Sequence, residues 1–385
     1  LDLYGVDGTQ TFAGSPAPMP SPWQNEGDLI KTLRQQHAVF TGKTHTVEFA
    51  FGGVGINSHW GTPQNPWDKH HHRAPGGSSS GAGVSLCEGS ALVALGSDTA
   101  GSVRIPASVT GNVGLKTSYG RWPVTGVFPL SPTLDTTGIL TRTVEDAVVA
   151  FSAIDPHQRS FGPRLARQVA QCQPSDFVIG IGERSLWEGC DPGICETVDD
   201  AIKQLSKAGV HAIEATLPEV TPAIELLKIG SVAAAEIDEM LEATAPGARD
   251  TLDPLVSSRI KEGGSISASE YLRRRRELRS LSRAANARFE NCQVIVSPTV
   301  AITPPKISDV QTIETYRPKN LGMLRNTCGA NYLSLCAITI PIGFDNAGMP
   351  VGLQLMAKHN HDESLLAIAS CMEKILGSGA SRLNC

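Results

Sequence analysis

The sequence has no excess of basic residues and no long apolar run. Its 385 residues include 33 Lys and Arg against 38 Asp and Glu, which gives a net charge of −5. Nucleic-acid-binding domains usually carry a basic patch, so this balance argues against a nucleic-acid partner. No stretch reaches the roughly 18 apolar residues that a membrane-spanning helix requires. We therefore expect no membrane span and no membrane partner, and no signal peptide is visible.

The nine cysteines lack the spacings that mark a metal site or a redox motif. No Cys-x-x-Cys pair occurs, the number is odd, and several cysteines lie in apolar segments. Free, mostly buried thiols in a cytoplasmic protein fit this pattern best. The three adjacent residues His70, His71 and His72 have no cysteine or carboxylate cluster beside them, and neighbouring side chains on a loop do not easily converge on one ion. We expect no metal and no other cofactor.

Composition and length leave the number of domains open. The chain is 41% hydrophobic and 18% charged, which are values of a globular protein. A chain of 385 residues fits two ordinary domains or one large α/β domain. After Asp155, a strand pattern at 177–181, a helix pattern at 195–208 and a strand pattern at 210–215 alternate, which predicts a mixed or parallel sheet.

Periodicity and end signals predict the other elements. Thr143 is the expected N-cap of a helix that ends near Ile154. The runs LCAITIPI and MPVGLQLM, on either side of a turn at 345–348, predict two paired strands. A loop around Gly263 and Gly264 is expected between two long helical stretches. Further helices are expected from Asp28 and at 80–88, 102–111, 221–247, 267–290 and 362–376, and further strands at 37–40, 92–95, 113–116 and 294–297.

The stretch from Pro75 to Gly120 is the poorest in large side chains and the richest in Gly and Ser. It contains two small-residue loops, GGSSSG at 76–81 and GSDTAGS at 96–102. Glycine has no Cβ, so such loops bring main-chain N–H groups close to something. Three interpretations follow: two turns of a compact unit, a phosphate site, or a serine nucleophile with an oxyanion hole. Neither loop matches GxxxxGK[ST] or GxGxxG, which disfavours a phosphate site.

The ordered string GGSSSG, GSDTAGSVRIPAS and GNVGLKTSYGR favours the serine nucleophile. It resembles the amidase signature family, which includes bacterial amidases, fatty acid amide hydrolase, allophanate hydrolase and the A subunit of the tRNA-dependent amidotransferase. The resemblance extends over about residues 2–356. It implies an α/β fold with one large domain at 1–385, whose central mixed, twisted β-sheet is flanked by helices on both faces.

The resemblance also implies different catalytic roles for two serines. In the family, one serine attacks an amide carbonyl, a second serine on a cis peptide bond relays its proton, and a lysine is the base. By position, Ser102 is the nucleophile and Ser78 is the relay serine, at the spacing that the family uses. The expected oxyanion hole is made by the backbone N–H groups of Thr99, Ala100, Gly101 and Ser102, where each donor contributes about 3–4 kcal/mol.

The walls of the pocket are expected on both sides of this signature. Ala50, Phe51 and Gly52 lie in a glycine-rich, aromatic stretch and match the positions that line the acyl side of the family's pocket. A variable helical insertion at about 217–290 usually shapes the leaving-group side. The catalytic core then comprises about 1–155 and 290–385.

Several polar residues near the signature have structural interpretations. Asp98 and Arg104 are expected to form a structural ion pair. Lys116 belongs to a strand and is expected to be structural. Ser79 and Ser80 are expected to cap a helix.

The base position departs from the family pattern. The family's lysine directly precedes an acidic-apolar-aromatic step, which Asp2-Leu3-Tyr4 matches, but the preceding residue here is Leu1. Three explanations stay open: lysine stands there in the parent protein, the lysine has been replaced, or the protein lacks this base. Lys43 is the nearest substitute in sequence, although its counterpart in the family is not catalytic. We expect an active parent enzyme and a segment before Leu1.

The leading hypothesis is a serine-dependent amidase that hydrolyses a C–N bond of a small linear amide through an acyl-enzyme. Carbamates, ureas and some esters share the carbonyl geometry and stay open as substrates. Two alternatives are a catalytically silent binding protein, which Leu1 motivates, and an amidotransferase A-type subunit. The expected partner is a small-molecule substrate, and a homodimer is left open.

Overall fold

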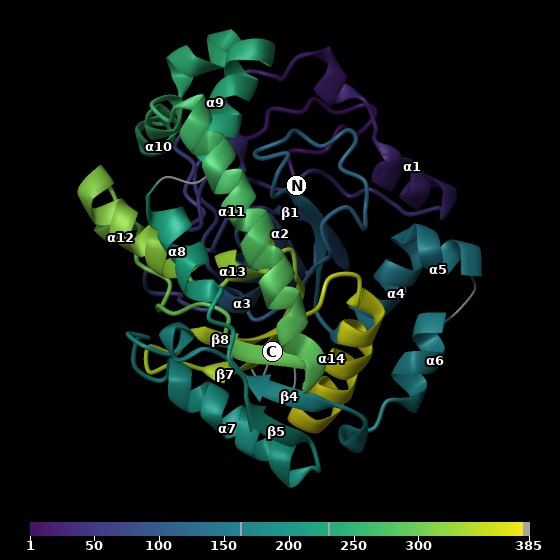
Figure 1. Ribbon diagram of the computed structural model, residues 1–385. Helices are drawn as coiled ribbons and strands as arrows, with labels where there is room; N and C mark the ends of the chain where they lie inside the picture. The colour runs from purple at the N-terminus through teal and green to yellow at the C-terminus, as the bar shows by residue number, and fades with distance from the viewer. Residues whose placement is uncertain (162–163, 230–231, 380–385) are drawn as a thin grey trace.

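The computed structural model describes residues 1–161, 164–229 and 232–379. These residues form one α/β domain around a single mixed eight-stranded sheet with the order β1-β3-β2-β7-β8-β6-β4-β5 (Figure 1). β4 runs parallel to β5 and β6, and every other pairing in the sheet is antiparallel. The strands are β1 (Val93–Asp98), β2 (Val113–Lys116), β3 (Thr136–Thr141), β4 (Val178–Ile181), β5 (His211–Glu214), β6 (Val294–Pro298), β7 (Cys336–Phe344) and β8 (Pro350–Ala357).

Helices cover both faces of the sheet, as the resemblance implied. On one face α4, α7 and α14 contact the strands, and on the other face α2 and α3 do. The central strands β7 and β8 are therefore buried on both sides, which explains their nearly continuous apolar runs. The helices on the first face and their neighbours are α4 (Val144–Ile154), α5 (Pro156–Phe161), α6 (Arg164–Gln171), α7 (Ile194–Lys207) and α14 (Asp362–Leu376).

A second group of helices lies at the end of the sheet where the Gly/Ser loops are. In Figure 1, α9 and α10 lie at the top of the molecule and α11 runs from them across its front. α9 packs against α10 and α11, and α10 packs against α12. The remaining helices are α1 (Asp28–Gln35), α2 (Ser80–Cys87), α3 (Arg104–Val109), α8 (Val220–Lys228), α9 (Val232–Thr244), α10 (Pro254–Gly264), α11 (Ala268–Asn286), α12 (Ile313–Leu324) and α13 (Cys328–Tyr332).

Local signals predicted many of these elements within one or two residues. The expected cap is present, because Thr143 Oγ1 accepts a hydrogen bond from Asp146 N at 3.0 Å. β2 and α14 have the expected bounds, and β7 and β8 pair as expected. No helix among the described residues is both long and apolar enough to cross a membrane.

Three expectations about elements are wrong. The stretch expected as one helix at 221–247 forms two helices, α8 and α9, and α8 ends at Lys228. Residues 37–40 form no strand: they follow α1 through a residue with positive φ, His37, and Val39 is 86% exposed. Gly263 and Gly264 end a helix, α10, instead of lying in a long loop. Asp253 caps this helix by accepting from Leu255 N at 2.7 Å. Gly263 allows α10 to approach α9, because a Cβ there would lie 2.2 Å from the Ala234 backbone.

Candidate active site

The two Gly/Ser loops meet at the ends of β1 and α2. The first loop leads into α2, and the second connects β1 to α3. They contact each other directly, since Ser79 N donates to Ser102 O at 3.2 Å. Ser78 is fully buried and Ser102 is 4% exposed. The fold thus brings the two predicted catalytic serines into one small-residue region.

Glycines make this close approach possible. The Gly77–Ser78 peptide bond is cis, as the resemblance implied. A Cβ on Gly77 would lie 2.6 Å from Gly52 O, so no larger residue fits there. Gly101 has φ of +133°, and a Cβ on it would lie 2.1 Å from Thr327 Oγ1. Both loops therefore depend on glycine at the positions next to the serines.

A buried ion pair fixes the second loop. Asp98, the last residue of β1, accepts from Gly101 N at 2.7 Å and from Val103 N at 3.1 Å. Arg104 Nη2 donates to Asp98 Oδ1 at 2.9 Å, and both side chains are fully buried. Burial acts to raise the pKa of Asp98, but the Arg104 guanidinium outweighs it and holds this pKa below its usual range. As expected, the pair is structural, and it sets the backbone on both sides of Ser102.

Breaking this pair should destabilise the protein strongly. Asp98→Asn leaves the Arg104 guanidinium without its counter-charge, so the free energy of unfolding should fall by about 3–5 kcal/mol. Urea unfolding measures this change. Arg273→Met is the matched control, because Arg273 pairs with Glu270 and Glu277 on the exposed face of α11, where each pair contributes about 0–1 kcal/mol. Equal losses in the two variants would contradict this assignment.

The second loop also presents unused backbone donors. Gly101 N–H already donates to Asp98 Oδ1. The N–H groups of Thr99, Ala100 and Ser102 donate to no other atom of the described residues. Of the four residues predicted for the oxyanion hole, these three line the small cavity beside Ser102 and have N–H groups without a partner among the described residues. Thr99 is in turn held by Asp135, whose Oδ1 accepts from Thr99 Oγ1 at 2.6 Å.

Ser78 is held by its backbone while its hydroxyl has no partner. Ser78 O accepts from Val47 N at 3.1 Å and from Thr46 Oγ1 at 3.2 Å. Its Oγ is buried and makes no hydrogen bond to a described residue. Leaving a buried hydroxyl unpaired costs about 1–3 kcal/mol, so a group that pairs with Ser78 Oγ would stabilise this site.

Leu1 begins the chain, next to a residue that is hydrogen-bonded to segment 44–47. Asp2 N donates to Thr44 O at 2.9 Å, and the chain continues from Thr44 to the residues that hold Ser78. The Leu1 side chain is 7% exposed and packs in the apolar core. Backbone hydrogen bonds thus connect Asp2 to segment 44–47, and the same segment holds Ser78 O.

The two other candidate lysines are engaged elsewhere. Lys43 Nζ lies 2.9 Å from Asp2 Oδ1 and donates to Thr11 Oγ1 at 2.7 Å. Lys116 Nζ is buried and donates to Thr117 O at 2.7 Å and to Leu335 O at 2.9 Å. Burial lowers the pKa of Lys116 to about 8, but its hydrogen bonds hold it at the centre of the sheet.

The Ser102 side chain opens into a small cavity, which we call the inner cavity. The predicted pocket residues Ala50, Phe51 and Gly52 line it together with the second loop. The other lining residues come from distant parts of the chain: Leu130, Leu134, Leu227, Ala233, Arg259, Leu324 and Tyr332. Leu227, Ala233 and Arg259 lie in the insertion that was expected to shape the leaving-group side, although none of them was predicted individually. The other four were not expected, because only the fold brings them to Ser102.

A buried carboxylate supports the wall of the inner cavity. Glu48 begins the short turn that contains Ala50, and its side chain is fully buried. Its Oε2 accepts from Asp253 N at 2.8 Å, and its Oε1 lies 3.1 Å from His59 Nε2. Burial raises the pKa of Glu48 to about 8, and the negative charge of Asp253 adds to this effect.

This shift predicts a pH-dependent stability. The folded state binds the Glu48 proton more tightly than the unfolded state does, so the protonated side chain adds to the free energy of unfolding at low pH. This contribution is lost as the pH rises from about 4.5 to about 8. Glu48→Gln stays neutral, so wild type should lose stability relative to this variant over that interval. Urea unfolding at several pH values measures the difference, and a difference that does not change with pH would contradict the prediction.

The two remaining serines of the first loop do not cap α2, so that expectation is wrong. No side chain caps the start of this helix. Ser79 Oγ donates weakly to Ser97 O at 3.5 Å, and Ser80 Oγ lies 2.7 Å from His45 Nδ1. Both hydroxyls turn to neighbouring segments because the backbone of this loop already contacts the second loop.

Comparisons with known proteins identify the family of this chain. A family model described as Amidase matches residues 2–366. A 2-amino-5-chloromuconic acid deaminase from Comamonas testosteroni is 45% identical over 382 residues, which cover 99% of this chain and 82% of the relative. A glutamyl-tRNA(Gln) amidotransferase subunit from Akkermansia muciniphila is 32% identical over 97% of this chain and 85% of its own length. A solved amidase structure superposes with a TM-score of 0.85 at 26% identity, covering 98% of this chain and 83% of that one.

Proposed function

This chain belongs to the amidase family and is a hydrolase of carbon–nitrogen bonds, and from that premise we propose that Ser102 attacks the carbonyl carbon of a small linear amide. One observation carries the proposal: Ser102 opens into the inner cavity beside backbone N–H groups that have no partner among the described residues. A hydroxyl and free N–H donors at one point are the two groups that acyl transfer needs.

The proposed reaction has two halves. Ser102 Oγ adds to the carbonyl as Ser78 takes its proton, and the N–H groups of Thr99, Ala100 and Ser102 stabilise the oxyanion. The tetrahedral intermediate collapses, the amine or ammonia leaves with a proton, and an acyl-enzyme ester remains. Water then attacks this ester and releases the carboxylic acid.

The base in this scheme is the residue at position 1. Leucine cannot accept a proton, so Ser102 and Ser78 have no base among the groups described above. We propose that a lysine at this position completes a Ser-cisSer-Lys triad, and that the chain with Leu1 has only the residual activity that the oxyanion hole and substrate binding supply. The unpartnered Ser78 hydroxyl supports this scheme.

A second candidate reaction is the hydrolytic deamination of an amino-substituted unsaturated acid. The relative from Comamonas testosteroni, named for such a deamination, favours it. In this reaction water supplies the oxygen at the carbon that carried nitrogen, and ammonia leaves. It needs the same cavity but no acyl ester on Ser102.

One assay separates the two reactions. The chain is incubated with a panel of primary amides, carbamates, ureas and 2-aminomuconic acid, and released ammonia is measured. Mass spectrometry of the quenched enzyme then looks for an acyl group on Ser102. Amide turnover with an acyl-Ser102 peptide supports the amidase, whereas turnover of 2-aminomuconic acid alone without this peptide supports deamination. Ammonia release from none of them, with Lys at position 1, would contradict both.

A further inference from the structure

The loop that leads into β3 forms one wall of the inner cavity and meets the second loop there. Leu130 and Leu134 of this loop line the cavity together with Thr99 of the second loop. Asp135 is the residue just before β3. Its Oδ1 accepts from Thr99 Oγ1 at 2.6 Å, and its Oδ2 accepts from Leu130 N and Ser131 N, both at 2.9 Å. One carboxylate thus joins two walls of the inner cavity.

Thr99 carries one of the free N–H groups beside Ser102 and is held on two sides. The carbonyl of the same peptide unit, Asp98 O, accepts from Thr136 Oγ1 at 2.8 Å and from Asn331 Nδ2 at 2.7 Å. A peptide unit is planar, so a fixed carbonyl also fixes the direction of the N–H group. The hydrogen bond from the Thr99 hydroxyl to Asp135 holds the side-chain end of the same residue.

A second carboxylate, Glu236 on α9, holds the same loop from the helical group. Its Oε2 accepts from Ser131 Oγ at 2.5 Å and from Thr133 N at 3.2 Å. Its Oε1 accepts from Thr133 Oγ1 and from the Tyr271 hydroxyl, the latter at 2.6 Å. The support chain, as we call it, therefore runs from Thr99 through the loop at 130–135 and Glu236 to Tyr271.

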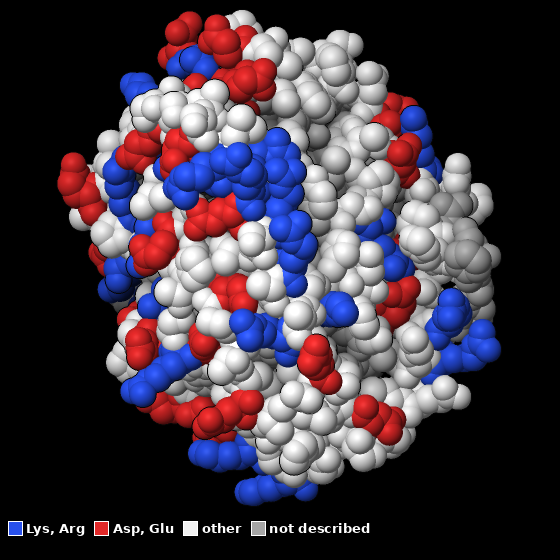
Figure 2. All heavy atoms as spheres, viewed as in Figure 1, with Lys and Arg blue, Asp and Glu red and all other residues white. Residues whose placement is uncertain are grey.

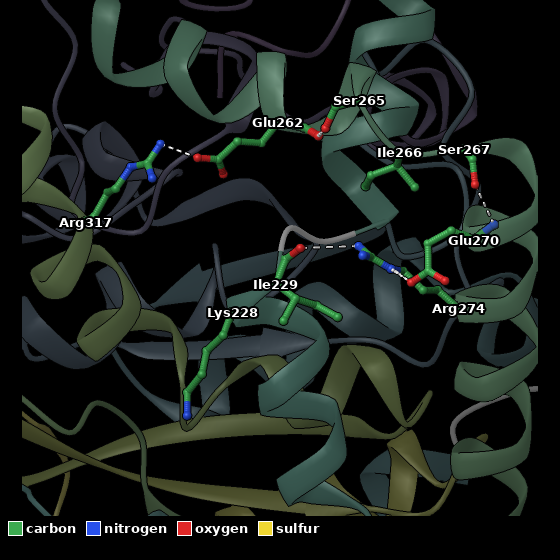
Figure 3. A pocket seen from close by; sticks show the side chains of 9 residues that line it. All are labelled: Lys228, Ile229, Glu262, Ser265, Ile266, Ser267, Glu270, Arg274 and Arg317. Atoms are coloured by element: carbon green, nitrogen blue, oxygen red, sulfur yellow. Dashed lines mark hydrogen bonds and ion pairs between the residues drawn. The ribbon is translucent and has the colours of Figure 1, made fainter.

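The far end of the support chain is anchored in the first turns of α11. Ser267 caps this helix by accepting from Glu270 N at 3.2 Å. Arg274 pairs with Glu270 at 2.7 Å and donates to Ile229 O at 3.5 Å, so the helix start is tied to the end of α8 (Figure 3). Tyr271 leaves α11 between these contacts, which makes it a fixed point for Glu236.

We propose that Asp135 is a positioning residue of the oxyanion hole, which directs the Thr99 N–H group through the Thr99 hydroxyl, and that Glu236 and Tyr271 hold Asp135 in place from α11. This inference rests on the proposed function. An oxyanion-hole donor acts only from a distance of about 2.7–3.1 Å, and a hydrogen bond weakens steeply when its geometry is distorted. Losing one donor lowers kcat by about 10²- to 10³-fold, so a displaced donor should cost somewhat less.

The first test removes the Thr99 hydroxyl at constant shape. Burial raises the pKa of Asp135 to about 7, and the charge of Glu236 adds to this effect, so assays at about pH 8.5 keep Asp135 ionised. In the Leu1→Lys chain, Thr99→Val should lower kcat for butyramide by about 10- to 100-fold and leave KM within about 3-fold. Thr99→Ser keeps the hydroxyl and should recover most of the loss. Asp135→Ala should lower kcat similarly, and the two losses should not add.

A transition-state analogue separates positioning from general damage to the site. With butyraldehyde, Ser102 Oγ bonds to the carbonyl carbon, its proton passes to the base, and the carbonyl oxygen becomes an oxyanion. Across the variants, log Ki of butyraldehyde should follow log(KM/kcat) of butyramide with a slope of about 1. Inhibition by butyrate, which places no oxyanion there, should stay within about 3-fold.

The second test acts at the far end of the support chain. Tyr271→Phe removes the hydroxyl that holds Glu236 and should lower kcat by about 3- to 10-fold without a change in KM. The matched control is Arg276→Met on the same helix. Arg276 is exposed, on a helix over which Lys and Arg side chains gather at the surface (Figure 2), so kcat should stay within about 2-fold.

The outcomes keep this inference apart from the proposed function. Butyramide turnover that stays within about 3-fold in Thr99→Val, or a loss that lies in KM alone, would overturn the role of Asp135 and leave the amidase reaction standing. Equal kcat in Tyr271→Phe and Arg276→Met would overturn the part of the support chain that reaches α11. A Leu1→Lys chain that neither hydrolyses butyramide nor binds butyraldehyde more tightly than butyrate would reject the proposed function, and this inference with it.

Discussion

Replacing Ser102 with alanine is expected to lower kcat for amide hydrolysis by about 10⁴- to 10⁶-fold, when lysine stands at position 1. The substitution removes the atom that forms the acyl ester, and no neighbouring hydroxyl has the same backbone donors around it. Residual turnover should come from the oxyanion hole and substrate binding alone. Ammonia release under saturating substrate measures the loss.

Fold stability should not explain this loss. Ser102 Oγ makes no hydrogen bond to a described residue, so its removal should change the free energy of unfolding by less than about 0.5 kcal/mol. Ser85→Ala is the matched control: its hydroxyl donates to Ala82 O within α2, and Ser85 does not line the inner cavity. Ser85→Ala should keep kcat within about 3-fold. Turnover retained in Ser102→Ala at the rate of its parent would reject Ser102 as the nucleophile.

Leu1→Lys is expected to raise kcat by about 10²- to 10⁴-fold, the usual contribution of a well-placed general base. Segment 44–47, which binds Asp2 N, also holds the backbone of Ser78, whose hydroxyl has no partner among the described residues. Burial at this site disfavours a charged ammonium, so a lysine there should be neutral enough to accept a proton. Steady-state kinetics with the same amide measures the gain.

Two variants separate this gain from a general effect on packing. Leu1→Met keeps an apolar side chain of similar size and should leave kcat unchanged. In a Ser78→Ala background, Leu1→Lys should bring little gain, because the relay between base and nucleophile is gone. An equal gain with and without the Ser78 hydroxyl would contradict the triad.

Many helices and strands could be predicted from the sequence, because neighbouring residues mark their ends and their buried faces. Thr143 and Asp146 form a cap from adjacent residues, and the runs that became β7 and β8 are apolar because both of their faces are covered. β3 was not predicted. Its segment is short and follows an irregular loop, and its place between β1 and β2 depends on pairing with strands on both sides. Local periodicity carries no information about such pairing.

The residues of the candidate site were also predictable only where a local motif marks them. Ser78 and Ser102 could be assigned because an ordered motif surrounds them. Arg259 could not be assigned to the site, because it lines the inner cavity while stacked against Phe51, which is far away in the sequence. The two glycines at 263 and 264 were interpreted as a loop, which concealed α10, whereas they are the last residues of this helix and Gly263 allows it to pack closely against α9.

The most direct test of the central claim is the covalent labelling of Ser102 by a fluorophosphonate. The reagent reacts with activated serine hydroxyls, and mass spectrometry of the intact chain and of its peptides locates the adduct. With Leu1→Lys, we predict one adduct per chain, on the peptide that contains Ser102, and its rate should fall sharply with Leu1 or with Ser78→Ala. No adduct in the Leu1→Lys chain, or an adduct on another serine, would contradict the account.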